Sequence, residues 1–281
     1  MNSRKDPIID IHAHAFDTFA GWDFLPEKIL GSKISYNTPQ NIEEHTKLCL
    51  SHFKENNLTA VIFGPNSRNW KKIAPDNIIH AIPLEVTSRL PTVTELREAH
   101  DRDELNLLGE ITFQYRGIPP NDPKLTPYYE LANDLNIPVI IHMGSSAPNI
   151  TYSGWGSAYR SSLTNPFLLE DVLNQYPDLR ICAAHSCWPM LEPLMHMLFT
   201  YPNLYTDISM INWVLTEKEF YYYFGRLVEA GFHEQIMYGS DLMIWPEIIP
   251  QSIERTSKAP FLSETQKRDI FYNNAKRFLK L

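Results

Sequence analysis

Short apolar runs alternate with amphipathic segments along the whole chain, and no other feature restricts the fold as strongly. Eight runs have the length and composition of buried strands: 8–14, 58–63, 78–86, 105–110, 137–142, 179–185, 203–209 and 235–241. Most segments between them carry helix signals: 41–56, 91–104, 125–135, 165–176, 190–201, 216–230 and 263–281. Strands that alternate with helices form a parallel sheet, and a count of eight favours a closed barrel over an open sheet. We therefore predict the α/β class, with a single (β/α)8 TIM barrel spanning residues 1–281 as one domain.

Several predicted helices have recognisable first residues. Asn41, Thr92 and Ser263 each stand three residues before a Glu or Gln, the spacing of a helix N-cap. His45 and His52 lie on the helix that follows Asn41, and we expect both to be structural.

Composition narrows the partners and the location. The net charge of −8 disfavours nucleic acid, because phosphate binding relies on Lys and Arg. No apolar run approaches the eighteen residues of a membrane-spanning helix, and residues 1–7 lack the apolar part of a signal peptide. We predict a cytoplasmic protein, with a removed signal peptide as the alternative. We expect its partner to be a small-molecule substrate, for which a carboxylate is one candidate. We expect it to bind neither nucleic acid nor a membrane. Whether it forms a homodimer is left open.

The cysteines do not form a recognisable framework. Cys49, Cys182 and Cys187 are an odd number without Cys-x-x-Cys spacing, which argues against a set of disulfides. We predict thiols in the core or at its rim.

The first strand ends on two imidazoles, His12 and His14. Side chains alternate along a strand, so Asp10, His12 and His14 share one face. Two His on one face can bind the same ion. Asp10 would then orient a ligand or fill the interior.

Residues of metal-ligand type recur at or near the ends of other predicted strands. The full set is His12, His14, Glu110, His142, His185 and Asp241. The carboxyl ends of barrel strands meet at one mouth, so we predict that these six gather around a common centre. No Cys belongs to the set, which argues against a closed structural zinc site. Imidazoles and carboxylates suit Zn²⁺, Mn²⁺, Fe²⁺ or Ni²⁺.

This ligand set suits hydrolysis. An ion with His ligands and an open position lowers the pKa of bound water toward about 7. Asp241, which closes the eighth run, is placed to accept a proton from that water. Two ions about 3.5–4 Å apart would need a bridging ligand, and Glu110 is the candidate on the fourth strand.

Four motifs together resemble the amidohydrolase superfamily. They are Asp10-x-His12-x-His14, His142 after Ile-Pro-Val-Ile-Ile, His185 in Ala-Ala-His-Ser, and Asp241 in Tyr-Gly-Ser-Asp. They are most similar to the amidohydrolase-related branch that includes aminocarboxymuconate-semialdehyde decarboxylase, and the likeness spans nearly the whole chain. It implies a barrel of the metallo-dependent hydrolase type, in which His12, His14 and Asp241 hold the first ion and Asp241 handles the proton.

The resemblance leaves the number of ions open. In single-metal members it implies His142 as a ligand and His185 as the catalytic acid/base or carbonyl polariser. In two-metal members both imidazoles hold the second ion and a fourth-strand group bridges. Gly109-Glu110 is similar to the Gly-Glu of TatD-type deoxyribonucleases, and a single-metal decarboxylase would not need Glu110. This carboxylate therefore favours hydrolysis.

The predicted function is a metal-dependent hydrolase that cleaves an amide, ester or lactone bond of a small molecule with activated water. Zn²⁺ is the expected cofactor, as one or two ions, with Asp241 and His185 as catalytic residues. The alternative is a metal-dependent decarboxylase or hydratase, a lyase acting on an unsaturated carboxylic acid. A TatD-like nuclease, disfavoured by the acidic charge, and a non-catalytic binding barrel are further alternatives.

Substrate contacts are predicted from residues beyond the strands. Arg68, Arg116 and Arg160 each offer a bidentate donor for a carboxylate, and Arg116 is favoured because it follows Glu110 closely. Trp155 and Tyr159 lie in a long Gly/Ser-rich segment and are expected to line the pocket.

Overall fold

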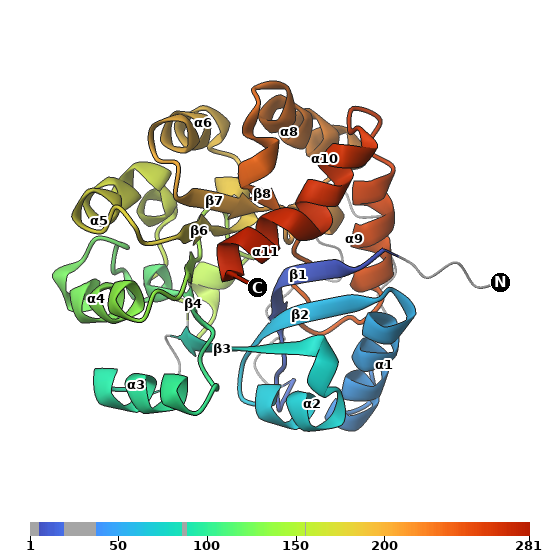
Figure 1. The fold of residues 1–281 in the computed structure, drawn as a ribbon, viewed down its shortest axis with the longest axis horizontal. Helices are drawn as coiled ribbons and strands as arrows, with labels where there is room; N and C mark the ends of the chain where they lie inside the picture. Colours follow the sequence, from blue (N-terminus) through green and yellow to red (C-terminus); the bar gives the residue numbers. More distant parts are fainter. Residues whose placement is uncertain (1–5, 20–37, 86–88, 155) are drawn as a thin grey trace. The chain divides into compact units, whose positions relative to one another are not determined.

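A computed structural model describes residues 6–19, 38–85, 89–154 and 156–281 (Figure 1). Eight strands form one sheet in the order β1 to β8. Their bounds are β1 Ile8–His14, β2 Leu58–Phe63, β3 Ile78–Leu84, β4 Leu107–Ile111, β5 Val139–Ile141, β6 Ile181–Ala183, β7 Leu204–Asp207 and β8 Ile236–Met237. Consecutive strands from β1 to β7 pair in parallel. The prediction of eight parallel strands with helices between them, in the order of a (β/α)8 barrel, is confirmed.

Helices follow most of the strands, as the alternating pattern requires. Their bounds are α1 Ile42–Glu55, α2 Ser67–Ile73, α3 Val93–Asp101, α4 Thr126–Asp134, α5 Glu170–Gln175, α6 Leu191–Thr200, α7 Ile211–Val214, α8 Glu217–Glu229, α9 Ile248–Ser257, α10 Glu264–Arg268 and α11 Asn274–Leu279. The predicted caps are present: the side chains of Asn41, Thr92 and Ser263 each accept a hydrogen bond from the backbone N–H three residues on. The last predicted helix is divided by a π-turn, η9 Asp269–Asn273, and α2, α7 and α9 were not predicted.

The described residues divide into two compact units. Unit 1 contains residues 6–19, 38–80 and Ile208–Leu281, and unit 2 contains Ala81–Asp207. The assignment of residues 1–281 to a single domain stays a prediction.

In unit 1, strand β1 is held on both sides. It pairs with β2, and Ala13 forms a parallel bridge with Leu242, which follows β8. The apolar side chains of Ile9, Ile11 and Ala13 are buried. Helix α11 packs against β1 and β8, so the end of the chain covers the strand that begins it (Figure 1).

Asn274, at the start of α11, fixes this packing. Its Nδ2 donates to the carbonyl oxygens of His233 and Ile236, at 2.7 and 2.6 Å, and its Oδ1 accepts from Arg277 at 2.7 Å. The side chain is fully buried. One amide therefore satisfies two backbone acceptors at the entry to β8.

Unit 2 carries strands β4 to β7, all with buried side chains. Gly109, in β4, has φ +130°, and a Cβ there would overlap the carbonyl oxygen of Ile140 in β5. Only glycine allows this close approach of two strands. This position, where glycine is required, directly precedes Glu110.

Besides β3 and β7, three strands end earlier than the sequence predicts, each before a predicted ligand. His142 follows the last residue of β5, His185 lies two residues beyond β6, and Asp241 lies four residues beyond β8. The expectation that these three residues close their strands is wrong. His185 and Asp241 have φ values of 57° and 52°, a left-handed conformation that an extended strand cannot contain.

The structure also bears on two predictions outside the strands, the structural role of His45 and the burial of the cysteine thiols. His45 is fully buried on α1, between the rings of Phe19 and Trp70, so it is a core residue. All three cysteines are buried thiols that form no disulfide, and burial raises the pKa of Cys49 and of Cys182 well above the usual value.

Among the helices of the described ranges, none has the length and apolar character needed to cross a membrane.

Candidate active site

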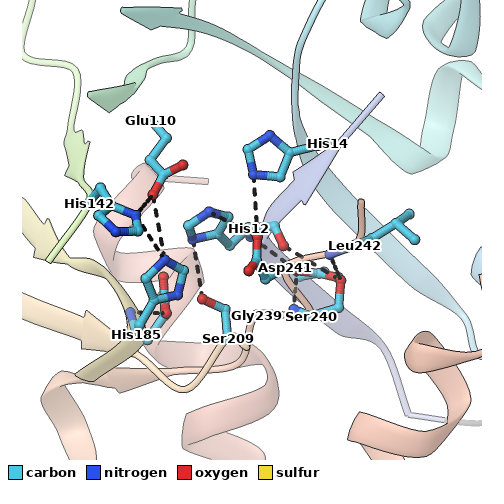
Figure 2. Close-up of polar contacts among 12 residues, drawn as sticks. His12, His14, Glu110, His142, His185, Ser209, Gly239, Ser240, Asp241 and Leu242 are labelled. Atoms are coloured by element: carbon cyan, nitrogen blue, oxygen red, sulfur yellow. Dashed lines mark hydrogen bonds and ion pairs between the residues drawn. The ribbon is translucent and has the colours of Figure 1, made fainter. Parts of the chain in front are cut away.

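The first cluster lies in unit 1 and contains His12, His14 and Asp241 (Figure 2). Oδ1 of Asp241 lies 3.3 Å from Nε2 of His14 and 3.7 Å from Nε2 of His12. All three residues are buried. The structure therefore brings Asp241 to two predicted ligands that lie more than 220 positions earlier in the sequence.

The ring of His12 is held by its other nitrogen. Nδ1 of His12 lies 3.3 Å from Oγ of Ser209, just beyond β7 (Figure 2). A hydrogen bond at Nδ1 directs Nε2 toward Asp241, which is the usual way a protein orients a ligand imidazole.

Asp10 supports the same cluster through the backbone. Its Oδ1 accepts the N–H of His12 at 3.0 Å and the N–H of Ser240 at 2.9 Å, which links β1 to the turn after β8. Burial raises the pKa of this carboxyl to about 6, and the hydrogen bonds from Ser240 and His12 oppose that rise. Asp10 thus fixes the path of the chain at the cluster and bonds no imidazole nitrogen in the described hydrogen bonds.

The turn that carries Asp241 is tight. The N–H of Asp241 donates to the carbonyl oxygen of His12 at 2.8 Å. A Cβ on Gly239 would lie 2.9 Å from Cβ of Ser209 and 3.0 Å from Cβ of His12. Only glycine, which has no side chain, lets this turn approach Ser209 and His12 so closely.

The second cluster lies in unit 2 and contains Glu110, His142 and His185 (Figure 2). Oε1 of Glu110 is 2.9 Å from Nδ1 of His142 and 3.5 Å from Nε2 of His185. The two ring nitrogens are 3.2 Å apart. All three side chains are buried, and their ligand atoms lie within 4.8 Å of one another.

These separations fit a shared metal ion. Ligand atoms about 2.0–2.2 Å from a tetrahedral Zn²⁺ lie roughly 3.3–3.6 Å from each other. The Glu110–His185 separation of 3.5 Å lies in that range, and the separations of 2.9 and 3.2 Å approach it. The donor chemistry, two imidazoles and one carboxylate, also fits a divalent cation.

Unit 2 holds its imidazoles through the backbone as well. Oδ1 of Asp207 accepts the N–H of His185 at 2.9 Å, which supports the left-handed turn after β6. The side-chain amide of Gln114 donates to the carbonyl oxygen of His142. The hydroxyl of Tyr115 lies 3.3 Å from Nε2 of His142.

Unit 2 contains a cavity of ≈ 420 Å³ that is lined by residues of the long Gly/Ser-rich segment. Its wall includes Ser145, Ser146, Tyr159 and Arg160. Nη1 of Arg160 donates to the carbonyl oxygens of Ser157 and Tyr159, at 3.2 and 2.7 Å. These two bonds hold one edge of the guanidinium at the wall.

Tyr159 ties the base of that loop. Its hydroxyl donates to the carbonyl oxygen of Gly144 at 3.0 Å and accepts the N–H of Ser146 at 3.1 Å. The ring is buried. Tyr159 therefore fixes part of the cavity wall.

The other predicted substrate contacts are less informative. Arg116 is exposed at the end of the short helix Phe113–Arg116, and Arg68 is exposed on α2. Trp155 lies outside the described residues. Their roles stay predictions.

Sequence reasoning missed the residues that support the ligands. Asp207 is a carboxylate at the end of β7. The other site residues were identified as residues of metal-ligand type at or near strand ends, and the same criterion applied to β7 would have identified Asp207. Ser209 and Tyr115 carry no such signal, because serine and tyrosine occur near most strand ends without a role. The arrangement of all six ligands around one centre also stays a prediction.

Similarity to known proteins agrees with the motifs. A family model described as amidohydrolase matches residues 91–281, which is more than half of the chain. The chain belongs to the amidohydrolase family. No curated protein matches this chain significantly.

Solved structures share the fold of this chain at low sequence identity. An uncharacterised TIM-barrel protein from Bordetella bronchiseptica is 18% identical, with a TM-score of 0.71 over 98% of this chain and 99% of that one. A protein described as a probable 2-pyrone-4,6-dicarboxylic acid hydrolase from Acinetobacter baumannii, with citric acid bound, is 16% identical, with a TM-score of 0.64 over 98% and 100%. A 5-carboxyvanillate decarboxylase from Novosphingobium aromaticivorans, complexed with manganese and a nitrobenzoic acid, is 13% identical, with a TM-score of 0.59 over 83% and 79%. They establish the TIM-barrel fold, and their chemistry is their own.

Proposed function

We propose that this member of the amidohydrolase family is a metal-dependent hydrolase that cleaves an amide, ester or lactone bond of a small molecule. The observation that carries the proposal is the position of Glu110, whose Oε1 lies 2.9 Å from His142 and 3.5 Å from His185. A carboxylate in reach of both imidazoles completes a ligand set that a single-metal decarboxylase would not need.

Each cluster is proposed to hold a divalent ion, with Zn²⁺ favoured and Mn²⁺, Fe²⁺ and Ni²⁺ as alternatives. His12, His14 and Asp241 are the ligands in unit 1, and Glu110, His142 and His185 are those in unit 2. A bound divalent ion supplies Lewis-acid polarisation of a carbonyl and lowers the pKa of water.

The protein's own groups are proposed to move the proton. Asp241 Oδ1 accepts the proton of the attacking water and returns it to the leaving group. If His185 does not hold the ion of unit 2, its proposed role is to steady the negative charge that develops on the carbonyl oxygen. Arg160, held at the wall of the cavity by two carbonyls, is proposed to bind a carboxylate of the substrate with its remaining N–H groups.

Replacement of Asp241 by Asn tests this assignment. We expect Asp241→Asn to lose turnover on a panel of esters, lactones and amides by on the order of a hundredfold or more, while retaining bound metal. Asp76→Asn, at an exposed site in the same unit, is the control and should keep both. Full turnover by Asp241→Asn would refute the role, and a wild-type protein that binds no divalent ion would refute the proposal as a whole.

A decarboxylase is the second candidate, supported by the fold shared with the manganese-containing 5-carboxyvanillate decarboxylase. It predicts release of carbon dioxide from an unsaturated carboxylic acid without consumption of water. It also predicts one bound ion, with Glu110 outside the ligand set. Metal content measured together with carbon dioxide release therefore separates the two candidates.

A further inference from the structure

The hydroxyl of Tyr115 links a predicted metal ligand to the wall of the cavity. It lies 3.3 Å from Nε2 of His142 and 2.7 Å from Oγ of Ser146. His142 turns its other nitrogen, Nδ1, toward Glu110 and His185. The two edges of one imidazole thus face different partners.

Hydrogen-bond chemistry gives this arrangement a direction. An imidazole nitrogen that binds a metal carries no proton, so the opposite nitrogen carries one and donates it. With Nδ1 of His142 on the ligand side, Nε2–H is the donor, and the phenol oxygen of Tyr115 is within reach as its acceptor. The Tyr115 O–H then donates to Ser146.

The neighbours of Tyr115 hold both its ring and its acceptor. The ring is buried, with its centroid 5.1 Å from that of His142 and 5.2 Å from that of Tyr159. Ser146 is fixed in turn, because its N–H donates to the Tyr159 hydroxyl at 3.1 Å. These contacts fix the position of the phenol oxygen of Tyr115 relative to His142.

We propose that Tyr115 is a positioning residue that orients His142, so that Nδ1 and not Nε2 faces Glu110 and His185. The proposal rests on the proposed metal-dependent function. Tyr115 touches neither the ion nor the substrate in this role; it acts through His142. Oriented ligands bind metal more tightly, and loss of such a support costs about 10- to 100-fold in affinity.

Tyr115→Phe removes the hydroxyl and keeps the ring. We expect its affinity for Zn²⁺ or Co²⁺, measured by competition with a chelator, to fall about tenfold or more. Tyr129→Phe is the matched control, because Tyr129 is another buried tyrosine of unit 2, whose hydroxyl donates to the carbonyl oxygen of Pro120. Its affinity should equal that of the wild type. Ser146→Ala, which removes the acceptor of the Tyr115 O–H, should weaken binding less than Tyr115→Phe.

A second measurement needs no variant. In wild-type protein labelled with ¹⁵N-histidine and loaded with Zn²⁺, the ¹⁵N spectrum should show a His142 ring bound to metal through Nδ1 and protonated at Nε2. Coordination through Nε2, or unchanged affinity in a folded Tyr115→Phe, would overturn the role of Tyr115. A wild type that binds neither Zn²⁺ nor Co²⁺ would instead refute the proposed function, so the two failures are distinguishable.

Discussion

Nδ1 of His12 lies 3.3 Å from the hydroxyl oxygen of Ser209, while Nε2 of the same ring lies 3.7 Å from Oδ1 of Asp241. The imidazole is thereby held from one edge and presented from the other. Ser209 is fully buried just beyond β7. It has the same relation to His12 in unit 1 that Tyr115 has to His142 in unit 2.

Removal of this hydroxyl should therefore weaken metal binding. We expect Ser209→Ala to lower the affinity of the protein for Zn²⁺ by about tenfold, because His12 loses the partner that orients it. Isothermal titration of the metal-free protein measures the change. Ser257→Ala, whose hydroxyl donates only to the carbonyl oxygen of Glu254 within α9, should bind as the wild type does. Equal affinities in the two variants would contradict the role of Ser209.

Gly239 should tolerate no side chain. A Cβ there would lie 2.9 Å from Ser209 and 3.0 Å from His12, closer than packed carbon atoms approach. We expect Gly239→Ala to lower the free energy of unfolding by about 1–3 kcal/mol and to weaken metal binding as well. Gly225→Ala is the control, since its nearest neighbour would be the Phe261 ring at 3.5 Å. Urea denaturation should show the control at least as stable as the wild type, because alanine favours a helix such as α8.

Asn274 should matter for stability far more than its neighbour. Asn274→Ala leaves the carbonyl oxygens of His233 and Ile236 without their side-chain donor, at a cost on the order of 2–3 kcal/mol. Asn273→Ala breaks only a contact with Asp269 and should cost less than about 1 kcal/mol. Thermal unfolding followed by circular dichroism measures both. A similar midpoint for the two variants would show that the buried amide is dispensable.

His45 should make stability depend on pH. Burial lowers its pKa to about 4, against an ordinary value of 6.5. As the pH falls below about 6.5, the unfolded chain takes up a proton at His45 that the folded chain does not, so stability is lost until about pH 4. A shift of this size corresponds to at most about 3 kcal/mol.

The comparison with His45→Leu isolates that contribution. Denaturant unfolding at about pH 7 and about pH 4.5 should show a smaller loss of stability in the variant than in the wild type, because leucine does not titrate. His100→Leu, on a half-buried histidine of α3, is the control. A wild type and a His45→Leu variant with the same pH dependence would show that His45 is protonated as readily in the folded state as in the unfolded one.

The sequence contained enough information for the existence of the strands and for the two groups of predicted ligands that the structure brings together, but less for the residues at which the strands end. Apolar runs such as 58–63 are long and regular, so β2 agrees with its predicted bounds. The runs that end on His142, His185 and Asp241 are predicted as strand to the last residue, because hydrophobic periodicity does not reveal a turn of one to four residues. His185 and Asp241 take left-handed φ values that are imposed by contacts with Asp207 and His12, far away in the sequence.

The contacts of Tyr115 with His142 and Ser146 were beyond prediction for a related reason. Tyr115 and Ser146 are 31 positions apart, and only the fold makes them neighbours. Arg116 was favoured because it lies near Glu110 in sequence. The structure places the adjacent Tyr115 against His142 and leaves Arg116 exposed.

The burial of Cys49, Cys182 and Cys187 has a practical consequence. A thiol-specific reagent reaches these sulfurs only when the chain opens, so the rate of native labelling measures opening of the core around them. A cysteine engineered on the surface, by contrast, reacts at once and selectively. Fluorophores or spin labels can thus be attached where they are wanted without first removing any of the natural thiols.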